Sequence, residues 1–343
     1  MKKLSQKQKR WNITKSRRQM VQLSKIKKRK NKRKRGIGSA DQNFNVQYMH
    51  KLHAPDNLSI LNDANQTTLN FFDHAITIIQ KCKIHEGIYF DFKDIVGVTA
   101  DAIMYVIALI NNYKRITVLN ILVSGNLPQN AEAKRFVEDI GFYSYVRGLK
   151  EVYPHSKERF RISQGEMPEG ELAGELCDFV LAKMKEGTKI STKRLYPMIV
   201  ELMTNTCQHA YRNENASKMK RNWYIFAEWK KDTIHFVFLD TGLGIPTTVR
   251  YTLLEKSINI IKRNDAAYIA SALRGENRTE TKQSNRGKGL PGIYQDTKDG
   301  WIKELSIISG KGKCDVTEDG KIREQVLKYN FEGTMFSWNF RIA

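Results

Sequence analysis

Features that mark secreted, disulfide-bonded and membrane-spanning proteins are scarce in this sequence. Its four cysteines, Cys82, Cys177, Cys207 and Cys314, lie far apart and form no C-x-x-C pair, which argues against a zinc ribbon and against a disulfide framework. No apolar run reaches the roughly 18 residues of a transmembrane helix, and the N-terminus lacks the apolar block of a secretory signal. We therefore expect a cytoplasmic protein without a membrane span.

Acidic residues are missing from the first 40 positions. These positions hold 17 of the 58 Lys and Arg, and the rest of the chain has 41 basic and 36 acidic residues, a net charge of +5 out of the total +22. A block of like charge repels itself and cannot bury a core, so residues 1–40 are expected to form a disordered tail. Counterion release would let this tail bind nucleic acid or a ribosome without reading sequence. A solubilising arm and contact with an anionic membrane surface are the alternatives.

Residues 41–150 alternate between strand and helix patterns. The predicted elements are a strand at 87–92 (GIYFDF), a helix at 99–113, a buried strand at 116–124 and a helix at 130–146 that Gly141 stops. This order predicts parallel βαβ packing.

The same region resembles the STAS fold of anti-sigma-factor antagonists. The shared features are a strand ending in Asp, a helix that opens with small or polar residues, a second strand, and a helix closed by a Gly-aromatic turn. In that family the helix start carries a phosphorylatable serine, whereas this chain reads TADA at 99–102. The resemblance therefore does not predict phosphorylation there, and Asp101 is a candidate for a fixed negative charge. A generic small α/β domain is the alternative interpretation.

A polar helix face follows the segment 151–190, which reads as a linker and a helix at 171–186. In ELMTNTCQHAY, Glu201 and Asn205 stand at i and i+4, and His209 follows one turn later, so all three share one face of a helix. An acid, an amide and an imidazole on one face indicate a ligand site. A polar surface stripe is the alternative.

Two further stretches combine a strand with glycine. TIHFVFLDTGLGIP predicts a buried strand that ends at Asp240, and Gly242 and Gly244 after it suit close backbone approach to a ligand. An ordinary Asp-containing turn is the alternative. Near the C-terminus, FEGTMFSWNF places Thr334 at the start of a closing strand.

A glycine motif lies between these stretches. SNRGKGLPGIYQ sets Gly287, Gly289 and Gly292 at G-x-G-x-x-G spacing. The motif does not follow the strand that opens a βαβ unit, so a dinucleotide-binding fold is not indicated.

These four blocks, in this order, resemble the GHKL ATPase superfamily of gyrase, heat-shock chaperones, histidine kinases and mismatch-repair ATPases, over residues 165–343. The resemblance implies ATP and Mg²⁺ as ligands. The expected fold class is α/β, with an N-terminal STAS-like domain followed by a GHKL α/β sandwich whose mixed sheet is covered by helices on one face. A lid is expected within 246–285, and the period of 250–275 makes that stretch largely helical.

The resemblance also assigns roles to individual residues. Asn205 corresponds to the asparagine that binds Mg²⁺ through its side-chain oxygen. Glu201 corresponds to the carboxylate that acts as base toward water or a substrate hydroxyl. The other implied roles concern ATP. The adenine amino group bonds Asp240, Gly242 and Gly244 leave room for the adenine, and Thr334 supports the aspartate. The phosphates bind at Gly287, Gly289 and Gly292. Lys288 is either a phosphate contact or a solvent-facing lid lysine, and His209 is either a phosphate contact or a packed histidine.

The first block looks most like that of the anti-sigma serine kinases, which act on STAS partners. No histidine lies in the helix-like segment that precedes the ATPase region, so a phosphohistidine relay is not predicted. We expect a switch in which hydrolysis or transfer of the γ-phosphate controls how the STAS-like region and the tail engage partners. The alternatives are a serine/threonine kinase and a non-catalytic nucleotide-sensing module that binds nucleic acid. A homodimer through the STAS-like region or the 171–186 helix is a further expectation.

Overall fold

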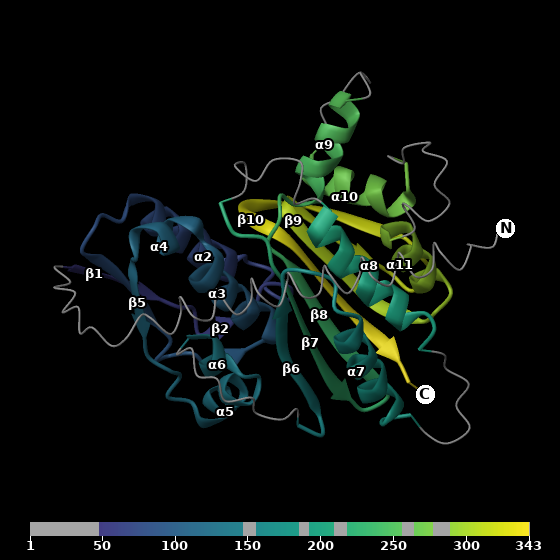
Figure 1. Ribbon diagram of the computed structural model, residues 1–343, viewed down its shortest axis with the longest axis horizontal. Coiled ribbons are helices and arrows are strands. Elements are labelled where there is room, and N and C mark those ends of the chain that lie inside the picture. The colour runs from purple at the N-terminus through teal and green to yellow at the C-terminus, as the bar shows by residue number, and fades with distance from the viewer. Residues whose placement is uncertain are drawn as a thin grey trace, which may run out of the picture. The chain divides into compact units, whose positions relative to one another are not determined.

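Two larger sheets of different type follow one another along the chain of the computed structural model (Figure 1). The structure describes residues 48–146, 156–184, 192–208, 218–255, 264–276 and 289–342, so the expected basic tail at 1–40 lies outside the described residues. All of them fall in one compact unit, Val46–Ala343. Across these ranges, every helix is too short or too polar to cross a bilayer.

The N-terminal region contains a three-stranded sheet in the order β1-β3-β5. Its elements are β1 (Tyr48–His53), β2 (Asn57–Leu58), α2 (Thr67–Lys81), β3 (Glu86–Asp91), β4 (Gly97–Val98), α3 (Ala100–Asn112), α4 (Lys114–Leu119), β5 (Leu122–Gly125), α5 (Ala131–Asp139) and α6 (Phe142–Val146). Both strand pairings are parallel, which confirms the predicted βαβ packing. The strand and the helix predicted at 87–92 and 99–113 are β3 and α3, each within one residue of its observed ends.

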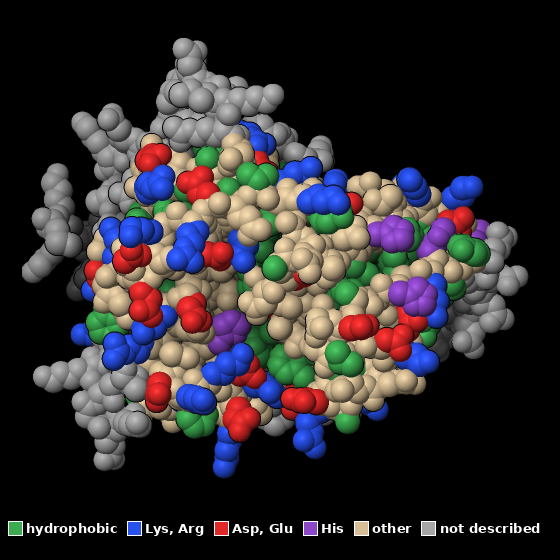
Figure 2. Space-filling view, turned by 180° about the vertical axis from the view of Figure 1, so that it is seen from behind, with side chains coloured by type: hydrophobic (Ala, Val, Ile, Leu, Met, Phe, Trp, Pro, Cys, Tyr) green, Lys and Arg blue, Asp and Glu red, His purple; other side chains and the backbone are tan. Residues whose placement is uncertain are grey.

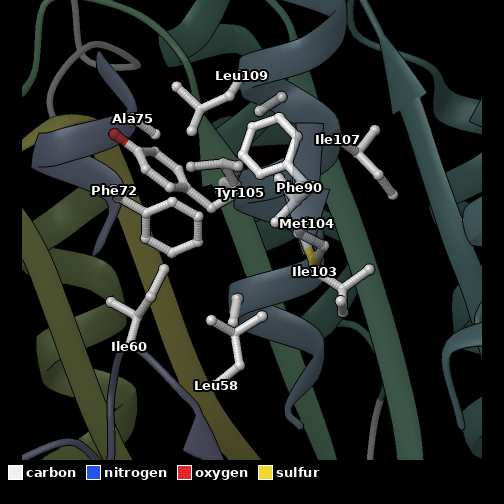
Figure 3. Close-up of a cluster of buried hydrophobic side chains, with 14 of the residues drawn as sticks. Leu58, Ile60, Phe72, Ala75, Phe90, Ile103, Met104, Tyr105, Ile107 and Leu109 are labelled. Carbon is white, nitrogen blue, oxygen red and sulfur yellow. The ribbon is translucent and has the colours of Figure 1, made fainter. Parts of the chain in front are cut away.

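Helix α3 forms the centre of the N-terminal core. Eleven of its residues are buried, as its almost continuous apolar sequence requires. Figure 3 shows its side chains between those of α2 and β3, where Tyr105 meets Phe72 edge to face with ring centroids 4.8 Å apart. Such pairing is the favoured geometry for two aromatic rings, and it fixes α2 against α3.

The strand predicted at 116–124 is wrong over most of its length. Residues Lys114–Leu119 form the short helix α4, and only Leu122–Gly125 pair with β3. The helix is held by its tertiary contacts, since the side chain of Ile116 is buried and the Lys114 N–H donates to the Lys218 carbonyl oxygen at 3.0 Å. These contacts outweigh the β preference of its branched residues. The break predicted at Gly141 is confirmed, because this residue has φ +91° and separates α5 from α6.

The C-terminal region contains a five-stranded sheet in the order β6-β7-β8-β10-β9. Its elements are β6 (Arg159–Gly165), α7 (Gly170–Leu181), α8 (Leu195–Gln208), β7 (Trp223–Lys230), β8 (Thr233–Asp240), α9 (Ile245–Glu255), α10 (Asp265–Arg274), α11 (Gly289–Lys298), β9 (Ile302–Val316) and β10 (Ile322–Arg341). All four pairings are antiparallel, so the expectation of a mixed sheet is wrong. Short connections join β7 to β8 and β9 to β10, and such hairpins allow only antiparallel pairing. The expected linker at 151–190 also supplies the edge strand β6.

Apolar side chains cover both faces of this sheet. One face, with Trp223, Phe236 and Trp338, packs against α7, α8 and α10. The other face, with Tyr224 and Leu239, joins the core of the N-terminal region. In Figure 1, α7 and α8 lie in front of the sheet. The five-stranded sheet is therefore the middle layer between these helices and the N-terminal region.

Helix α3 makes polar as well as apolar contacts with the sheet. Its Tyr105 ring stacks on Phe331 with centroids 4.4 Å apart, and the Tyr105 hydroxyl accepts the Glu332 N–H at 3.1 Å. At the C-terminal end of α3, the Asn112 amide donates to the Tyr224 hydroxyl at 2.7 Å and accepts from the Asn222 amide at 3.2 Å. The middle of the helix and its C-terminal end thus contact two different parts of the C-terminal region.

Candidate functional site

Glu201 and Asn205 share one face of α8, as predicted, and the residue that faces them is Gly289. A Cβ atom built on Gly289 would lie 2.8 Å from the Glu201 Cγ, 2.9 Å from its Oε1 and 3.0 Å from the Asn205 Nδ2. Real Cβ atoms almost never come so close to other atoms, so only glycine fits here without displacing a polar side chain. Two motifs that are far apart in the sequence therefore meet.

Gly289 is also the first described residue of α11, and the residues directly before it lie outside the described ranges. The start of a helix presents unpaired backbone N–H groups and the positive end of the helix dipole, which together favour an anion such as phosphate. The ten-residue α11 is fixed at its other end by Arg194, which precedes α8 and forms ion pairs with Asp296 at 2.5 Å and Asp299 at 2.8 Å. The polar face of α8 and the start of α11 are thereby held together.

The Glu201 carboxyl has the character expected of a base. It is partly buried, and burial raises its pKa above that of an exposed glutamate. A raised pKa brings a carboxylate closer to neutral pH, where it accepts a proton more effectively. Within the described residues, neither Glu201 nor Asn205 has a side-chain hydrogen-bond partner. Both polar groups are therefore available to a ligand.

Asp240 ends β8 on the same side of the sheet. Side chains two apart on a strand point the same way, so Asp240 faces the helices together with Phe236 and Phe238. The Gly242 N–H donates to the Asp240 Oδ1 at 2.6 Å and fixes the carboxyl. Burial raises the Asp240 pKa to about 6, although this bond and the charge of Arg221 act in the opposite direction. Asp240 is thus a fixed carboxylate that is still largely ionised at pH 7.

Thr334 lies directly opposite Asp240 in the pairing of β10 with β8. Its hydroxyl is 3.1 Å from the hydroxyl of Ser309 on β9, and both side chains are buried. Ser309 also donates to the Gly333 carbonyl oxygen at 2.7 Å and accepts the Ile245 N–H at 3.0 Å, so it joins β9, β10 and the start of α9. Sequence reasoning missed Ser309, because a serine in the strand pattern ELSIISG carries no motif.

The glycines around Asp240 are explained by close packing within the chain. Gly244 has φ +81°, and a Cβ there would lie 2.7 Å from the Ser309 Oγ. Gly333 has φ +108°, and a Cβ there would run into the backbone oxygen of Asp240. Glycine is required at both positions because the turn after β8 lies directly against the residues just before Thr334. The resemblance assigns to Gly244 the role of leaving room for the adenine ring, and this role remains a prediction.

Helix α8 connects the two groups of residues. Cys207 lies one turn beyond Met203 on α8, and its thiol donates to the Glu166 carbonyl oxygen at 3.1 Å. Burial raises the Cys207 pKa, and the negative charge of Asp240 raises it further. Glu166 directly follows Gly165, which pairs with Trp223, and Trp223 pairs with Asp240, so the C-terminal part of α8 lies over this end of the sheet. Asn205 is two residues from Cys207 on α8, whereas Glu201 and Gly289 lie farther along the same helix-covered side of the sheet.

Several predicted site residues lie outside the described residues, namely His209, Gly287 and Lys288. Gly292 is described within α11, and a Cβ built on it would have no heavy atom within 4 Å. In the expected lid segment the structure shows α9 and α10, in agreement with the helical period of 250–275, and residues 256–263 between them are outside the described ranges.

Asp101 does not present its charge to the surface. Its side chain is only 4% exposed, and its Oδ2 accepts the N–H groups of Ile60 and Leu61, both at 2.9 Å. The carboxylate therefore holds the segment after β2 against the start of α3. This structural role replaces the idea that Asp101 acts as an exposed fixed charge.

No protein-family model matches the sequence, and a comparison with the curated proteins finds no match. Function must therefore be argued from the residues of the site and their geometry.

Proposed function

We propose that this chain is an ATP-binding protein of the GHKL type that hydrolyses ATP, or transfers its γ-phosphate, with Mg²⁺. In this proposal the reaction switches the interactions of the STAS-like region and the basic tail. The observation that carries it is the contact of Gly289 with Glu201 and Asn205, because it brings the glycine motif and the acid–amide helix face, which are far apart in the sequence, to one place.

The residues present fit Mg²⁺ and a triphosphate. Asn205 offers a partly buried amide oxygen, a hard ligand suited to Mg²⁺. When bound, Mg²⁺ neutralises phosphate charge. Gly289 leaves the space beside Asn205 free of side-chain atoms, and the N–H groups at the start of α11 favour phosphate oxygens. Glu201 lies beside both and accepts the proton of the attacking water or hydroxyl.

The adenine end of the nucleotide is assigned to Asp240. A carboxylate accepts a charge-assisted hydrogen bond from the exocyclic amino group of adenine, and such bonds are stronger than those between neutral groups. The Gly242 N–H bonds the Asp240 Oδ1 and orients the carboxyl, so the Asp240 Oδ2 is left to accept from the adenine amino group. The hydroxyls of Ser309 and Thr334 hold the neighbouring strands in place.

Contacts of α3 connect the STAS-like region to the proposed nucleotide site. Tyr105 binds Phe331 and Glu332, which directly precede the Gly333 and Thr334 of the site. At the C-terminal end of α3, the Asn112 amide oxygen accepts from the Asn222 side chain, and the Asn222 N–H donates to the Thr241 hydroxyl at 2.8 Å beside Asp240. Two described contacts thus join the STAS-like region to the strand ends that flank the adenine position. A shift of those strand ends on nucleotide binding would change the contacts of α3.

The kinase alternative retains support from the α8 sequence. It also restricts the acceptor, because the start of α3 carries no serine and its Asp101 is buried. A phosphoryl group would therefore find no serine acceptor at the start of α3. In either form the proposal places the protein in the cytoplasm, with protein partners at the STAS-like region and nucleic acid at residues 1–40. It also includes a homodimer.

Binding of ATP tests the proposal directly. Calorimetric titration of the full chain should show one ATP per chain with an affinity that depends on Mg²⁺. Asn205→Ala should remove the Mg²⁺ dependence, whereas Asn126→Ala, in the N-terminal region, should leave it intact. Wild-type protein that does not bind ATP in the presence of Mg²⁺ would refute the proposal.

A further inference from the structure

Three different metal-binding side chains converge in the N-terminal region, far from any role assigned above. His50 lies on β1, Cys82 directly follows α2, and Glu86 is the first residue of β3. One ligand atom from each lies within 4.8 Å of the other two. The His50 Nε2 and the Glu86 Oε2 are 3.0 Å apart.

The local fold explains why they meet. Parallel pairing sets Tyr48 opposite Glu86 and His50 opposite Ile88, so His50 and Glu86 are close neighbours on one face of the sheet. Cys82 closes α2, where its N–H donates to the Ile78 carbonyl oxygen at 2.8 Å. A tight turn then leads straight into β3, which brings the thiol beside the carboxylate.

The surroundings suit a cation that approaches from solvent. The side chains of His50 and Glu86 are 29% and 22% exposed, whereas Cys82 is only 1% exposed. The thiol is thus on the inner side of the cluster and the other two groups on the outer side. Figure 2 shows histidine side chains gathered on this part of the surface, among acidic and basic ones. The Arg115 guanidinium donates to the Cys82 carbonyl oxygen at 2.8 Å and so holds the cysteine in place.

We propose that His50, Cys82 and Glu86 bind Zn²⁺, with a fourth position open to water or an external ligand. Around a tetrahedral zinc ion, ligand atoms at the usual bond lengths lie about 3.3–3.8 Å apart, so modest side-chain rotations convert the observed cluster into a coordination site. Thiolate and carboxylate together balance the charge of the ion, and binding releases the thiol proton to solvent. The ion takes the place of the hydrogen bond between His50 and Glu86.

The donor set favours Zn²⁺ over Mg²⁺. Thiolate and imidazole are soft and borderline ligands, whereas Mg²⁺ selects oxygen and retains much of its water. The zinc site is therefore chemically distinct from the proposed ATP site, and it does not depend on that proposal. In a protein without this function, the same residues would be a histidine–glutamate ion pair beside a buried thiol.

Cobalt spectroscopy of the full-length protein tests the site in the absence of nucleotide. Metal-depleted protein titrated with Co²⁺ should gain a thiolate-to-cobalt charge-transfer band at one ion per chain, and Zn²⁺ should abolish this band by displacement. Cys82→Ser and His50→Ala should lose the band and weaken Zn²⁺ binding by more than about 100-fold, the upper range for loss of a group that merely supports a ligand. Cys177→Ser, a buried thiol on α7, and His74→Ala, an exposed histidine on α2, are the matched controls.

The proposal is overturned if no charge-transfer band forms, or if the band survives in Cys82→Ser. Zn²⁺ binding of equal strength in His50→Ala and His74→Ala would likewise assign it to adventitious surface sites. Should Cys82→Ser fail to fold, Glu86→Gln and His50→Ala decide the question, because both side chains are partly exposed and their replacement leaves the core intact.

Discussion

Gly289 and Glu201 are in such close contact that a Cβ atom on the glycine would lie 2.8 Å from the Glu201 Cγ. One residue belongs to a glycine-rich motif and the other to a polar helix face, and neither motif alone identifies a site. Their contact places a helix start, a carboxyl of raised pKa and a free amide side by side. This combination suits the handling of a phosphate group and a divalent cation.

Replacement of Gly289 by alanine should impair ATP binding while leaving the fold largely intact. The added methyl group must displace Glu201 or Asn205, and overpacking of this kind costs about 1–3 kcal/mol. We expect calorimetry to show ATP affinity at least about tenfold lower, which equals 1.4 kcal/mol. Gly174→Ala is the control, because a Cβ at this position on α7 meets nothing within 4 Å. Equal loss of affinity in both variants would contradict the account.

Glu201→Gln should separate binding from turnover. The amide keeps the size of the side chain but cannot accept the proton, so ATP binding should persist while kcat falls by about 10²–10⁴-fold. Steady-state phosphate release together with an ATP titration measures both quantities. Glu175→Gln, an exposed glutamate on α7, should behave like wild type. Turnover at the wild-type rate in Glu201→Gln would exclude this residue as the base.

Asp240→Asn should stabilise the protein and weaken ATP binding together. The Asp240 pKa rises from 3.8 in the unfolded chain to about 6 in the folded protein. Protonation of this carboxyl therefore stabilises the folded state, and this contribution is complete only below pH 4. That contribution is lost as the pH rises through 6, and the loss amounts to no more than roughly 3 kcal/mol. The Asn variant does not lose stability in this way. The excess of its free energy of unfolding over that of the wild type should therefore grow between pH 4 and pH 6.

Urea denaturation of both proteins across this pH range measures the effect. ATP affinity should fall about 10- to 100-fold in the variant, since a hydrogen bond to a charged group contributes about 1.5–3 kcal/mol. A stability difference that does not change with pH would show that Asp240 is not the buried titrating group.

The contact between Asn112 and Tyr224 should couple the two regions energetically. Asn112→Ala removes the donor that bonds the buried Tyr224 hydroxyl at 2.7 Å and the acceptor of the Asn222 amide, at a cost of about 1–3 kcal/mol. Tyr224→Phe removes the other partner, so the double variant should be less destabilised than the sum of the two single variants. A coupling energy of at least about 0.5 kcal/mol from chemical denaturation is expected. Additive effects would show that the bond contributes nothing to joining the regions.

Deletion of residues 1–40 should abolish salt-sensitive binding to nucleic acid. The segment supplies 17 basic and no acidic residues, so the affinity of the full chain should fall steeply with salt as counterions rebind. Fluorescence anisotropy with a labelled oligonucleotide at several salt concentrations measures the slope. ATP turnover without nucleic acid should not change, and a deletion variant that keeps the wild-type salt slope would place the binding site elsewhere.

Patterns local to one segment were predictable from the sequence. The period of α3, the buried strand β3, the stop at Gly141 and the shared face of Glu201 and Asn205 follow from side-chain spacing and backbone freedom. Features that depend on distant contacts were not predictable. Residues Lys114–Leu119 form a helix whose Lys114 N–H bonds the Lys218 carbonyl oxygen far along the chain, and Ser309 has its role only because β9 and β10 pair beside Gly244.

The cluster of His50, Cys82 and Glu86 is a similar case. Its spacing matches no metal-binding motif, and only the parallel register of β1 and β3 brings the three side chains together. The antiparallel sheet could have been inferred from its two short hairpins, whereas the resemblance led to the expectation of a mixed sheet.

The most direct test of the central claim uses the purified full-length protein with Mg²⁺ and γ-labelled ATP, following free phosphate and labelled protein together. We predict that label appears in one of these two products and that Asn205→Ala abolishes it. Free phosphate would identify an ATPase switch, and label on protein would identify a kinase. Wild-type protein that produces neither, while still binding ATP tightly, would contradict catalysis and leave a nucleotide sensor.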